Sequence, residues 1–374
     1  MKKIPLCLTA FDQKEIDAAV EVMKSGWMAH GPKNHEFEEL FKDFIGVEHA
    51  ISMNSCFSAL YIALVAMGIK GEVITPSFTF VATANSIVLA GAKPVLVDID
   101  KNTRNISPEC IEQAITENTE AIMVVHYAGL PADMPSIIKI ADKYGLKIIE
   151  DSAETLGGSY DGKTAGSYGV GCFSFFPTKN ITTGEGGMLT TNDGPLATKI
   201  KGLIAHGIDS TTYAREKAEK PWLRIASRFG FNFRMSNLLA TIGVEQMKKI
   251  KSLNSKRTEI AERYIRNLKS IEAISFQEIP SGFTSSWQMF TILVPSSMRE
   301  TLLSHLNGNG IGASVHFDPP VHTQSLYSQL PHGSSLAVTE EVSSSLITLP
   351  IYPDMKPDEV DYVCQAISGF KQFY

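Results

Sequence analysis

The sequence has no apolar run approaching the roughly 18 residues that a membrane-spanning helix requires. Its first residues, MKKIPLCLTAFDQKE, contain two lysines but lack the apolar stretch of a secretory signal peptide. Cysteine is scarce as well. The five cysteines form no C-x-x-C pair and lie far apart, at positions 7, 56, 110, 172 and 364. We therefore expect a reduced, cytoplasmic protein without disulfide bonds.

Basic residues are not in excess, since 34 Lys and Arg stand against 40 Asp and Glu and the net charge is -6. A nucleic-acid-binding protein needs a basic face, so this composition argues against that class. The nine histidines form neither an H-E-x-x-H motif nor a Cys/His cluster, and we predict no metal site. With 374 residues, the chain is long enough for a large domain, predicted at 1–250, and a smaller one at 251–374.

Short apolar runs alternate with helical stretches through the first half of the chain. The runs predict buried strands at 49–53, 72–75, 94–99, 121–126 and 147–151. This rhythm predicts an α/β fold with a mostly parallel sheet covered by helices on both faces. Further strands are expected at 170–176 and 186–191, followed by a long helix at 236–268. The remainder is expected to be a smaller α/β unit, with strands at 289–294 and 312–317.

Lys179 lies in the stretch FSFFPTKNITTGEGGMLTT, between two strand-like runs and close to several glycines. Partial burial of a lysine at the mouth of a sheet favours the neutral amine, which is the nucleophilic form. The glycines allow the backbone to approach a ligand closely. A surface lysine in a glycine-rich turn is the alternative, and the spacing alone favours that simpler interpretation.

Two further stretches can supply the rest of a cofactor site. Asp151 ends the apolar run of IIEDSAETLGG, where an ionised carboxylate can hold a cationic heterocycle, or can simply cap the next segment. Ser55 and Cys56 stand at a strand-to-helix turn, where a helix N-terminus offers free N–H groups to a phosphate. An ordinary capped helix explains that turn equally well. Ser174 can add a hydroxyl to the same phosphate.

Taken together, these stretches resemble the DegT-type sugar-nucleotide aminotransferases, a branch of the fold-type-I enzymes that use pyridoxal 5'-phosphate (PLP). The resemblance runs over essentially the whole chain. It rests on SGW (25–27), TPSFTFVATANSI (75–87), EDSAETLGG (150–158), FSFFPTKN (173–180), EGGML (185–189), GFNFRMSNLLATIG (230–243) and VHFDPPVH (315–322). The order of the seven stretches carries the argument, since no single one suffices.

The resemblance implies a role for each matching residue. Lys179 corresponds to the lysine that binds the cofactor covalently and then transfers the proton. Asp151 corresponds to the partner of the pyridine nitrogen, and Phe80 to the aromatic residue stacked on the ring. Glu154 corresponds to the position near the ring's phenolic oxygen. The residues implied for the phosphate are Ser174, Ser55, Cys56 and, from the neighbouring subunit of a homodimer with shared active sites, Asn232.

Two residues depart from the family pattern, because Cys56 stands where Thr is common and Glu154 where Gln or His is frequent. The related dehydratases replace the lysine with His, so Lys179 favours transamination. The implied reaction moves an amino group from glutamate to a nucleotide-linked keto sugar, with a 4-keto-6-deoxy sugar preferred. Candidate residues for the sugar nucleotide are His316, His206, Trp222 and Arg234, with Trp222 in a predicted substrate-facing insertion at 209–229. A structural role for His316 and a structural salt bridge for Arg234 are the alternatives.

Two rival interpretations remain at this level. A Rossmann dehydrogenase is disfavoured because GNGIG at 308–312 lacks the full G-x-G-x-x-G pattern and lies late in the chain. A PLP-binding regulator without turnover, or an aminotransferase acting on something other than a sugar, shares the same fold. No basic helix-turn-helix supports regulation of DNA.

Overall fold

Seven strands form the central sheet of the computed structural model, which describes residues 3–208, 219–220, 222–328 and 335–373. Their spatial order is β1-β9-β8-β5-β4-β2-β3, and all run parallel except β9, which is antiparallel to β8 and β1. The mostly parallel sheet expected from the sequence is therefore confirmed. The strands are β1 (His49–Met53), β2 (Glu72–Pro76), β3 (Lys93–Val97), β4 (Thr119–Val125), β5 (Lys147–Asp151), β8 (Val170–Ser174) and β9 (Gly187–Thr191).

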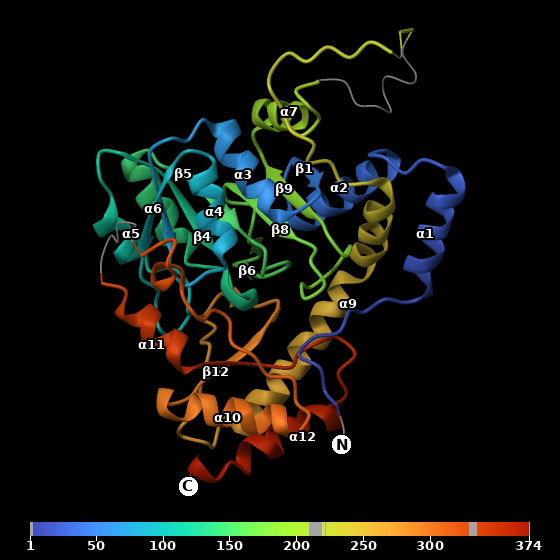
Figure 1. Cartoon of the computed structure of the whole chain (residues 1–374). Helices are drawn as coiled ribbons and strands as arrows, with labels where there is room; N and C mark the ends of the chain where they lie inside the picture. Colours follow the sequence, from blue (N-terminus) through green and yellow to red (C-terminus); the bar gives the residue numbers. More distant parts are fainter. Residues whose placement is uncertain (1–2, 209–218, 221, 329–334, 374) are drawn as a thin grey trace.

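Helices cover both faces of this sheet, because successive side chains of the strands point to opposite sides (Figure 1). Val73 and Met123 pack toward one group of helices, whereas Ile74 and Ile122 pack toward the other. The two buried faces explain why the strands read as continuous apolar runs. The first group is α3 (Cys56–Met67), α4 (Val81–Leu89) and α7 (Gly194–Leu203), and the second is α5 (Pro108–Ala114) and α6 (Met134–Tyr144).

A third layer of helices lies against the β1 and β9 end of the sheet. It consists of α1 (Gln13–Ser25), α2 (Pro32–Ile45) and the long α9 (Asn237–Leu268). Phe37 and Phe41 of α2 pack against Phe173 and Phe175, with ring centroids 4.9 to 5.7 Å apart. From this layer α9 continues into the rest of the chain, where its second half joins another core (Figure 1).

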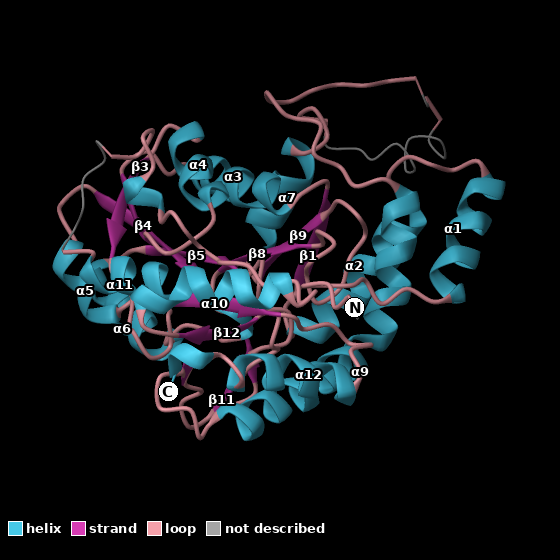
Figure 2. Cartoon of the chain, turned by 60° about the horizontal axis from the view of Figure 1, so that its bottom comes forward, coloured by secondary structure: helices cyan, strands magenta, loops and turns pink. Residues whose placement is uncertain are grey.

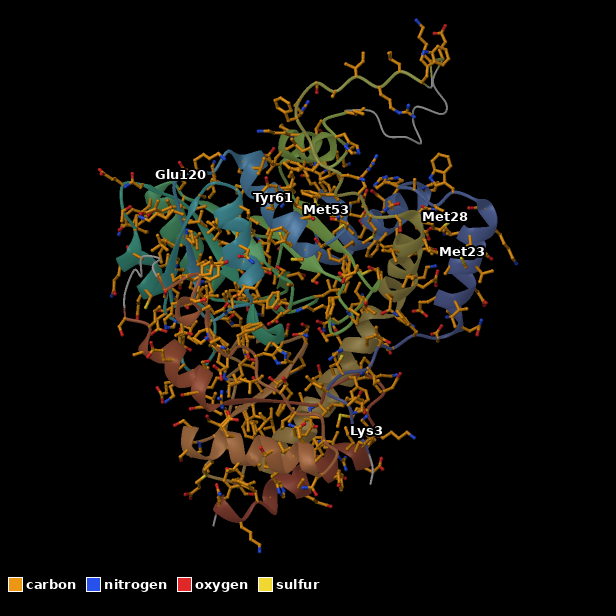
Figure 3. The ribbon with its side chains drawn as sticks, in the orientation of Figure 1. Lys3, Met23, Met28, Met53, Tyr61 and Glu120 are labelled. Atoms are coloured by element: carbon orange, nitrogen blue, oxygen red, sulfur yellow. The ribbon has the colours of Figure 1, made fainter. Side chains whose placement is uncertain are left out.

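The C-terminal part is built on a three-stranded antiparallel sheet, with β12 (Phe290–Leu293) between β10 (Ser275–Phe276) and β13 (Leu346–Leu349). Figure 2 brings this part forward, with α10 (Ser296–Gly308) and α12 (Pro357–Ser368) beside β12; α11 (Ala337–Ser345) precedes β13. The N-terminus also lies here: Ile4 pairs with Ile311, and Lys3 is seen near this part in Figure 3.

The prediction of a strand at 312–317 is wrong, because within this range only Ser314 forms a β-bridge, with Thr348. The next carbonyls bond elsewhere: that of His316 accepts from the Tyr127 hydroxyl, and that of Phe317 from the Ser343 hydroxyl. A second small sheet, β11-β6-β7, was not anticipated and joins Phe283–Thr284 to Ser159–Tyr160 and Lys163–Thr164. Within the described residues, no helix is both long and apolar enough to span a membrane.

Candidate active site

A cavity of about 360 Å³ lies where the parallel strands end. In an open α/β sheet the carboxyl edge is the usual place for a ligand, since loops from several strands meet there. The C-terminal part closes the cavity through residues beside β12 and β13. The predicted site residues that line it are Lys179, Asp151, Glu154, Ser174, Phe80, Ser55, Cys56 and His316.

Lys179 is carried on the loop between β8 and β9. Phe175 N donates to the Gly186 carbonyl at 3.0 Å and closes this loop, and Lys179 N donates to the Phe176 carbonyl at 2.9 Å. The Lys179 amine lies 3.5 Å from Glu154 Oε1, and the two side chains are 16% and 9% exposed. Among the described residues that line the cavity, Lys179 is the only Lys or Arg. A single partly buried amine thus faces a carboxylate inside the cavity.

Asp151 lies at the end of β5 and is 5% exposed. Its carboxylate accepts a hydrogen bond from Thr83 Oγ1 at 2.8 Å and another from Ala153 N at 3.2 Å. Burial raises the pKa of Asp151, and the Thr83 hydrogen bond opposes that effect only in part. A buried carboxylate of this kind is stabilised by a cationic ligand, so the position suits a protonated ring nitrogen.

The turn before α3 forms a tight cradle. The Ser55 hydroxyl caps the helix by accepting from Ser58 N at 3.1 Å, and the first N–H groups of α3 have no intrahelical acceptor. Gly187 lies so close that a Cβ there would be 2.4 Å from the Ser55 carbonyl carbon and oxygen. Ser174 pairs with Gly187 across β8 and β9 and borders the same space. The Cys56 side chain is buried, and burial raises the pKa of its thiol well above its usual value, so it stays protonated.

Aromatic and imidazole side chains form the opposite wall. Phe80 stands just before α4 and is 59% exposed, with its ring centroid 6.2 Å from that of Phe317. His316 Nδ1 lies 3.0 Å from the Thr348 hydroxyl. Burial lowers the pKa of His316, and the nearby Lys179 acts in the same direction. A neutral imidazole beside Lys179 can accept or donate a hydrogen bond to a polar ligand.

Four predicted residues do not line this cavity. Arg234 Nη2 donates to Asn232 Oδ1 at 2.9 Å and lies 3.3 Å from His206 Nε2, so these three form a separate cluster. Trp222 is 70% exposed and belongs to a segment that projects beyond α7 (Figure 1). Residues 209–218 of the expected insertion lie outside the described residues.

Several residues that line the cavity or support its side chains were not found from the sequence. Thr83 holds Asp151 from within α4, and Gln288, Met289 and Phe317 come from the C-terminal part. Thr83 and Phe317 fall inside two of the seven stretches that resemble the family, so the resemblance could have identified them as candidates. Gln288 had no such signal, because it stands just before the run at 289–294, which reads as an ordinary strand.

A lysine opposite a buried aspartate, at the carboxyl edge of a helix-covered parallel sheet, defines the class: the fold is that of fold-type-I PLP transferases. Residues 9–368 match the DegT/DnrJ/EryC1/StrS aminotransferase family, and the chain belongs to that family. An uncharacterized protein of Methanocaldococcus jannaschii is 42% identical over 95% of this chain and 94% of its own.

Solved structures of aminotransferases share this fold. Helicobacter pylori PseC, an aminotransferase involved in the biosynthesis of pseudoaminic acid, is 30% identical, with a TM-score of 0.92 over 99% of this chain and 100% of its own. TlmJ, an aminotransferase from Streptoalloteichus hindustanus, is 28% identical, with a TM-score of 0.92 over 100% of both chains. The PLP form of Spr1654, a candidate sugar aminotransferase from Streptococcus pneumoniae, is 26% identical, with a TM-score of 0.91 over 100% of both chains.

Proposed function

We propose that the protein uses PLP to transfer an amino group from glutamate to a nucleotide-linked keto sugar, with a 4-keto-6-deoxy sugar preferred. The observation that carries the proposal is that Lys179 and the buried Asp151 line one cavity. Membership of the family, the involvement of PseC in the biosynthesis of pseudoaminic acid and the similarity to Spr1654, a candidate sugar aminotransferase, support the sugar substrate. The product would serve the biosynthesis of a glycan or another amino-sugar compound.

The residues present fit PLP at three points. The carboxyl of Asp151 is buried and accepts hydrogen bonds, and it forms no ion pair within the described part of the chain, which suits a ring nitrogen that carries a proton. The α3 N-terminus, opened by the absence of a side chain at Gly187 and bordered by Ser174, suits the phosphate. Phe80 presents an exposed ring at the cavity wall, where it can stack on a planar group.

When bound, PLP supplies an electron-withdrawing ring that stabilises negative charge on the substrate carbon. Lys179 Nζ takes up a proton from that carbon and returns one, as general base and then general acid. Asp151 remains ionised and keeps the ring nitrogen protonated. Glu154, which also accepts a hydrogen bond from Ala128 N at 3.3 Å, holds the charged amine near the reacting atoms. His316 orients the sugar.

Three experiments test this proposal. Borohydride reduction of the protein with PLP should fix the cofactor on Lys179, as read by peptide mass spectrometry, and Lys179→Ala should abolish both labelling and turnover. In a separate sample that has not been reduced, addition of glutamate should convert the cofactor to its amine form, which separates an enzyme from a regulator. A panel of nucleotide-linked 4-keto and 3-keto sugars, with products identified by mass and NMR, would identify the acceptor.

A homodimer with shared active sites belongs to the same proposal. Among the described residues that line the cavity, Lys179 is the one Lys or Arg, whereas three carry carboxyls: Asp151, Glu154 and Glu185. A cofactor phosphate and a nucleotide diphosphate need more positive charge than this lining provides. Arg234, with Asn232 and His206, lies outside the cavity and is available to a second copy. Exposed apolar side chains on the projecting segment support such an interface: Trp222, Leu223, Ile225 and Phe229.

We further propose two domains divided at residue 250 and a cytoplasmic location. A division at residue 250 is supported by the separate cores of the two sheets, although α9 crosses that position. A cytoplasmic location is supported by the free state of the five cysteines.

A further inference from the structure

The loop that carries Lys179 is held from outside by the short segment Ser286–Gln288 and also by Asn254 of α9, whose Oδ1 accepts from Asn180 Nδ2 at 2.9 Å. Gln288 Nε2 donates to the Thr178 carbonyl at 2.9 Å, and Asn180 Nδ2 donates to the Ser286 carbonyl at 2.9 Å. Thr178 and Asn180 are the two residues that flank Lys179. The lysine is therefore fastened on both sides to a segment more than 100 positions away in the chain.

This segment is itself firmly held. Ser286 N donates to the Gly129 carbonyl at 2.9 Å, and a Cβ on Gly129 would lie only 2.5 Å from Trp287 N. Arg257 Nη1 donates to the carbonyls of Trp287 and Gln288 at 3.4 and 3.3 Å. Trp287 has a φ of 47°, a left-handed conformation that such surrounding contacts must stabilise. The segment therefore acts as a fixed support, not as a loose loop.

The side chain of Gln288 is the polar link between this support and the lysine loop. It is 4% exposed and borders the cavity. Its Nε2 has the Thr178 carbonyl as acceptor, whereas its Oε1 is buried and has no hydrogen-bond donor among the described residues. A half-satisfied buried amide is unfavourable compared with an apolar side chain of similar size. A role for the N–H end of the amide explains why a polar residue stands here.

The bond from Gln288 fixes the peptide that joins Thr178 to Lys179. The N–H of this peptide donates to the Phe176 carbonyl within the loop, and its C=O accepts from Gln288. Both polar groups of the peptide are thus engaged, which sets its plane and the direction in which the Lys179 side chain leaves the backbone. The long side chain then meets Glu154 and the cavity from a defined starting point.

We propose that Gln288 is a positioning residue for Lys179, acting through the Thr178 carbonyl. The inference rests on the proposed function, in which Lys179 binds PLP. It predicts that loss of the Nε2 donor slows covalent attachment of PLP to Lys179, even when the protein is folded and saturated with the cofactor.

The test measures the rate of attachment in three variants, by quenching the cofactor-free protein and PLP with borohydride at timed intervals. Attachment forms a C=N bond between the lysine nitrogen and the cofactor's aldehyde carbon with loss of water, and borohydride reduces that bond. Gln288→Met removes the donor but keeps the volume, and we expect attachment about 10- to 100-fold slower. Gln288→Glu keeps the donor only when the introduced carboxyl is protonated. Its rate relative to wild type should therefore rise as the pH falls.

Gln277→Met is the matched control. Gln277 is 5% exposed, and its Nε2 donates to the carbonyls of Thr103 at 2.7 Å and Tyr127 at 3.3 Å. This variant loses a similar buried amide and should lose similar thermal stability, yet attach PLP at the wild-type rate. If Gln288→Met does not fold, the pH dependence of Gln288→Glu, which a purely structural role would not produce, carries the test.

The outcomes are distinguishable. Wild-type attachment in Gln288→Met, equal slowing in Gln277→Met, or a constant relative rate for Gln288→Glu across pH would overturn the assignment of Gln288. Absence of labelling on Lys179 in the wild-type protein would instead overturn the proposed function, and the positioning role with it.

Discussion

Gly187 begins β9 with its backbone against the α3 N-terminus, the part of the cavity that we propose binds the cofactor phosphate. A Cβ here would lie 2.4 Å from the Ser55 carbonyl carbon and oxygen and 2.6 Å from Cys56 N, whereas ordinary contact begins at 3.4 Å. All three neighbours are backbone atoms, so no rotamer change relieves the overlap. Gly187→Ala must therefore shift the 55–56 turn by roughly 1 Å, since the pairing of β9 with both neighbouring strands limits movement of its own backbone.

Two quantities should change together. Overpacking of this kind costs about 1–3 kcal/mol in the free energy of unfolding, which urea denaturation of the cofactor-free protein would measure. A displacement of about 1 Å at a binding turn should weaken PLP binding by roughly 100-fold, measured by titration in the Lys179→Ala background so that only noncovalent binding contributes. Gly308→Ala is the control, because nothing lies within 4 Å of a Cβ there, and neither quantity should fall. Destabilisation of Gly187→Ala without loss of PLP affinity would refute the α3 N-terminus as the phosphate site.

Three further changes have defined outcomes. Asp151→Asn should abolish turnover yet raise the melting temperature of the cofactor-free protein, because burial raises the pKa of Asp151; the gain should grow as the pH rises through that pKa, and a scanning calorimetry series checks it. Burial lowers the pKa of His316 from 6.5, so the wild-type protein should lose stability as the pH falls through about 6.5. His316→Gln should lack this loss in urea titrations between about pH 5 and 7. If active sites are shared, equal mixing of Lys179→Ala and Arg234→Ala chains should restore about a quarter of wild-type turnover, whereas separate sites would restore none.

The central fold could be predicted from the sequence because each strand of the parallel sheet is buried on two faces. Such a strand appears in the sequence as a short, continuous apolar run. The run at 121–126 is an example, and the observed strand Thr119–Val125 matches it closely. The small sheets carried no such signal. β6 and β11 have two residues each, which is too short for any period to appear. The prediction of a strand at 312–317 failed although the residues suit a strand, because beyond Ser314 the carbonyls of His316 and Phe317 accept hydrogen bonds from side chains instead of a neighbouring strand.

Some residues of the candidate site could likewise be predicted from the sequence, whereas others could not. Lys179, Asp151 and Ser55 stand at the ends of predicted strands or in the loop between two of them, so the topology of a parallel sheet brings them to one edge. The side chains that support them come from elsewhere. Thr83 reaches Asp151 from α4, and its own hydroxyl lies 2.8 Å from that of Thr79. Such a chain of hydroxyls depends on the rotation of one helix about its axis, which a pattern of apolar residues fixes only roughly.

Comparison of Gln288 with Lys179 shows why the sequence could predict the lysine but not the residue that supports it. The position of Lys179 in the sequence follows from chemistry, since a primary amine is needed where the strands end. The identity of Gln288 follows from a packing arrangement in which Arg257, Gly129 and the 286–288 segment fix one another before any side chain reaches the cavity. A residue selected by such an arrangement can be recognised only when its neighbours in space are known. In the proposed role of Gln288, the reactivity of Lys179 depends on the contact between both parts of the chain, because the C-terminal part holds the backbone next to Lys179 in place.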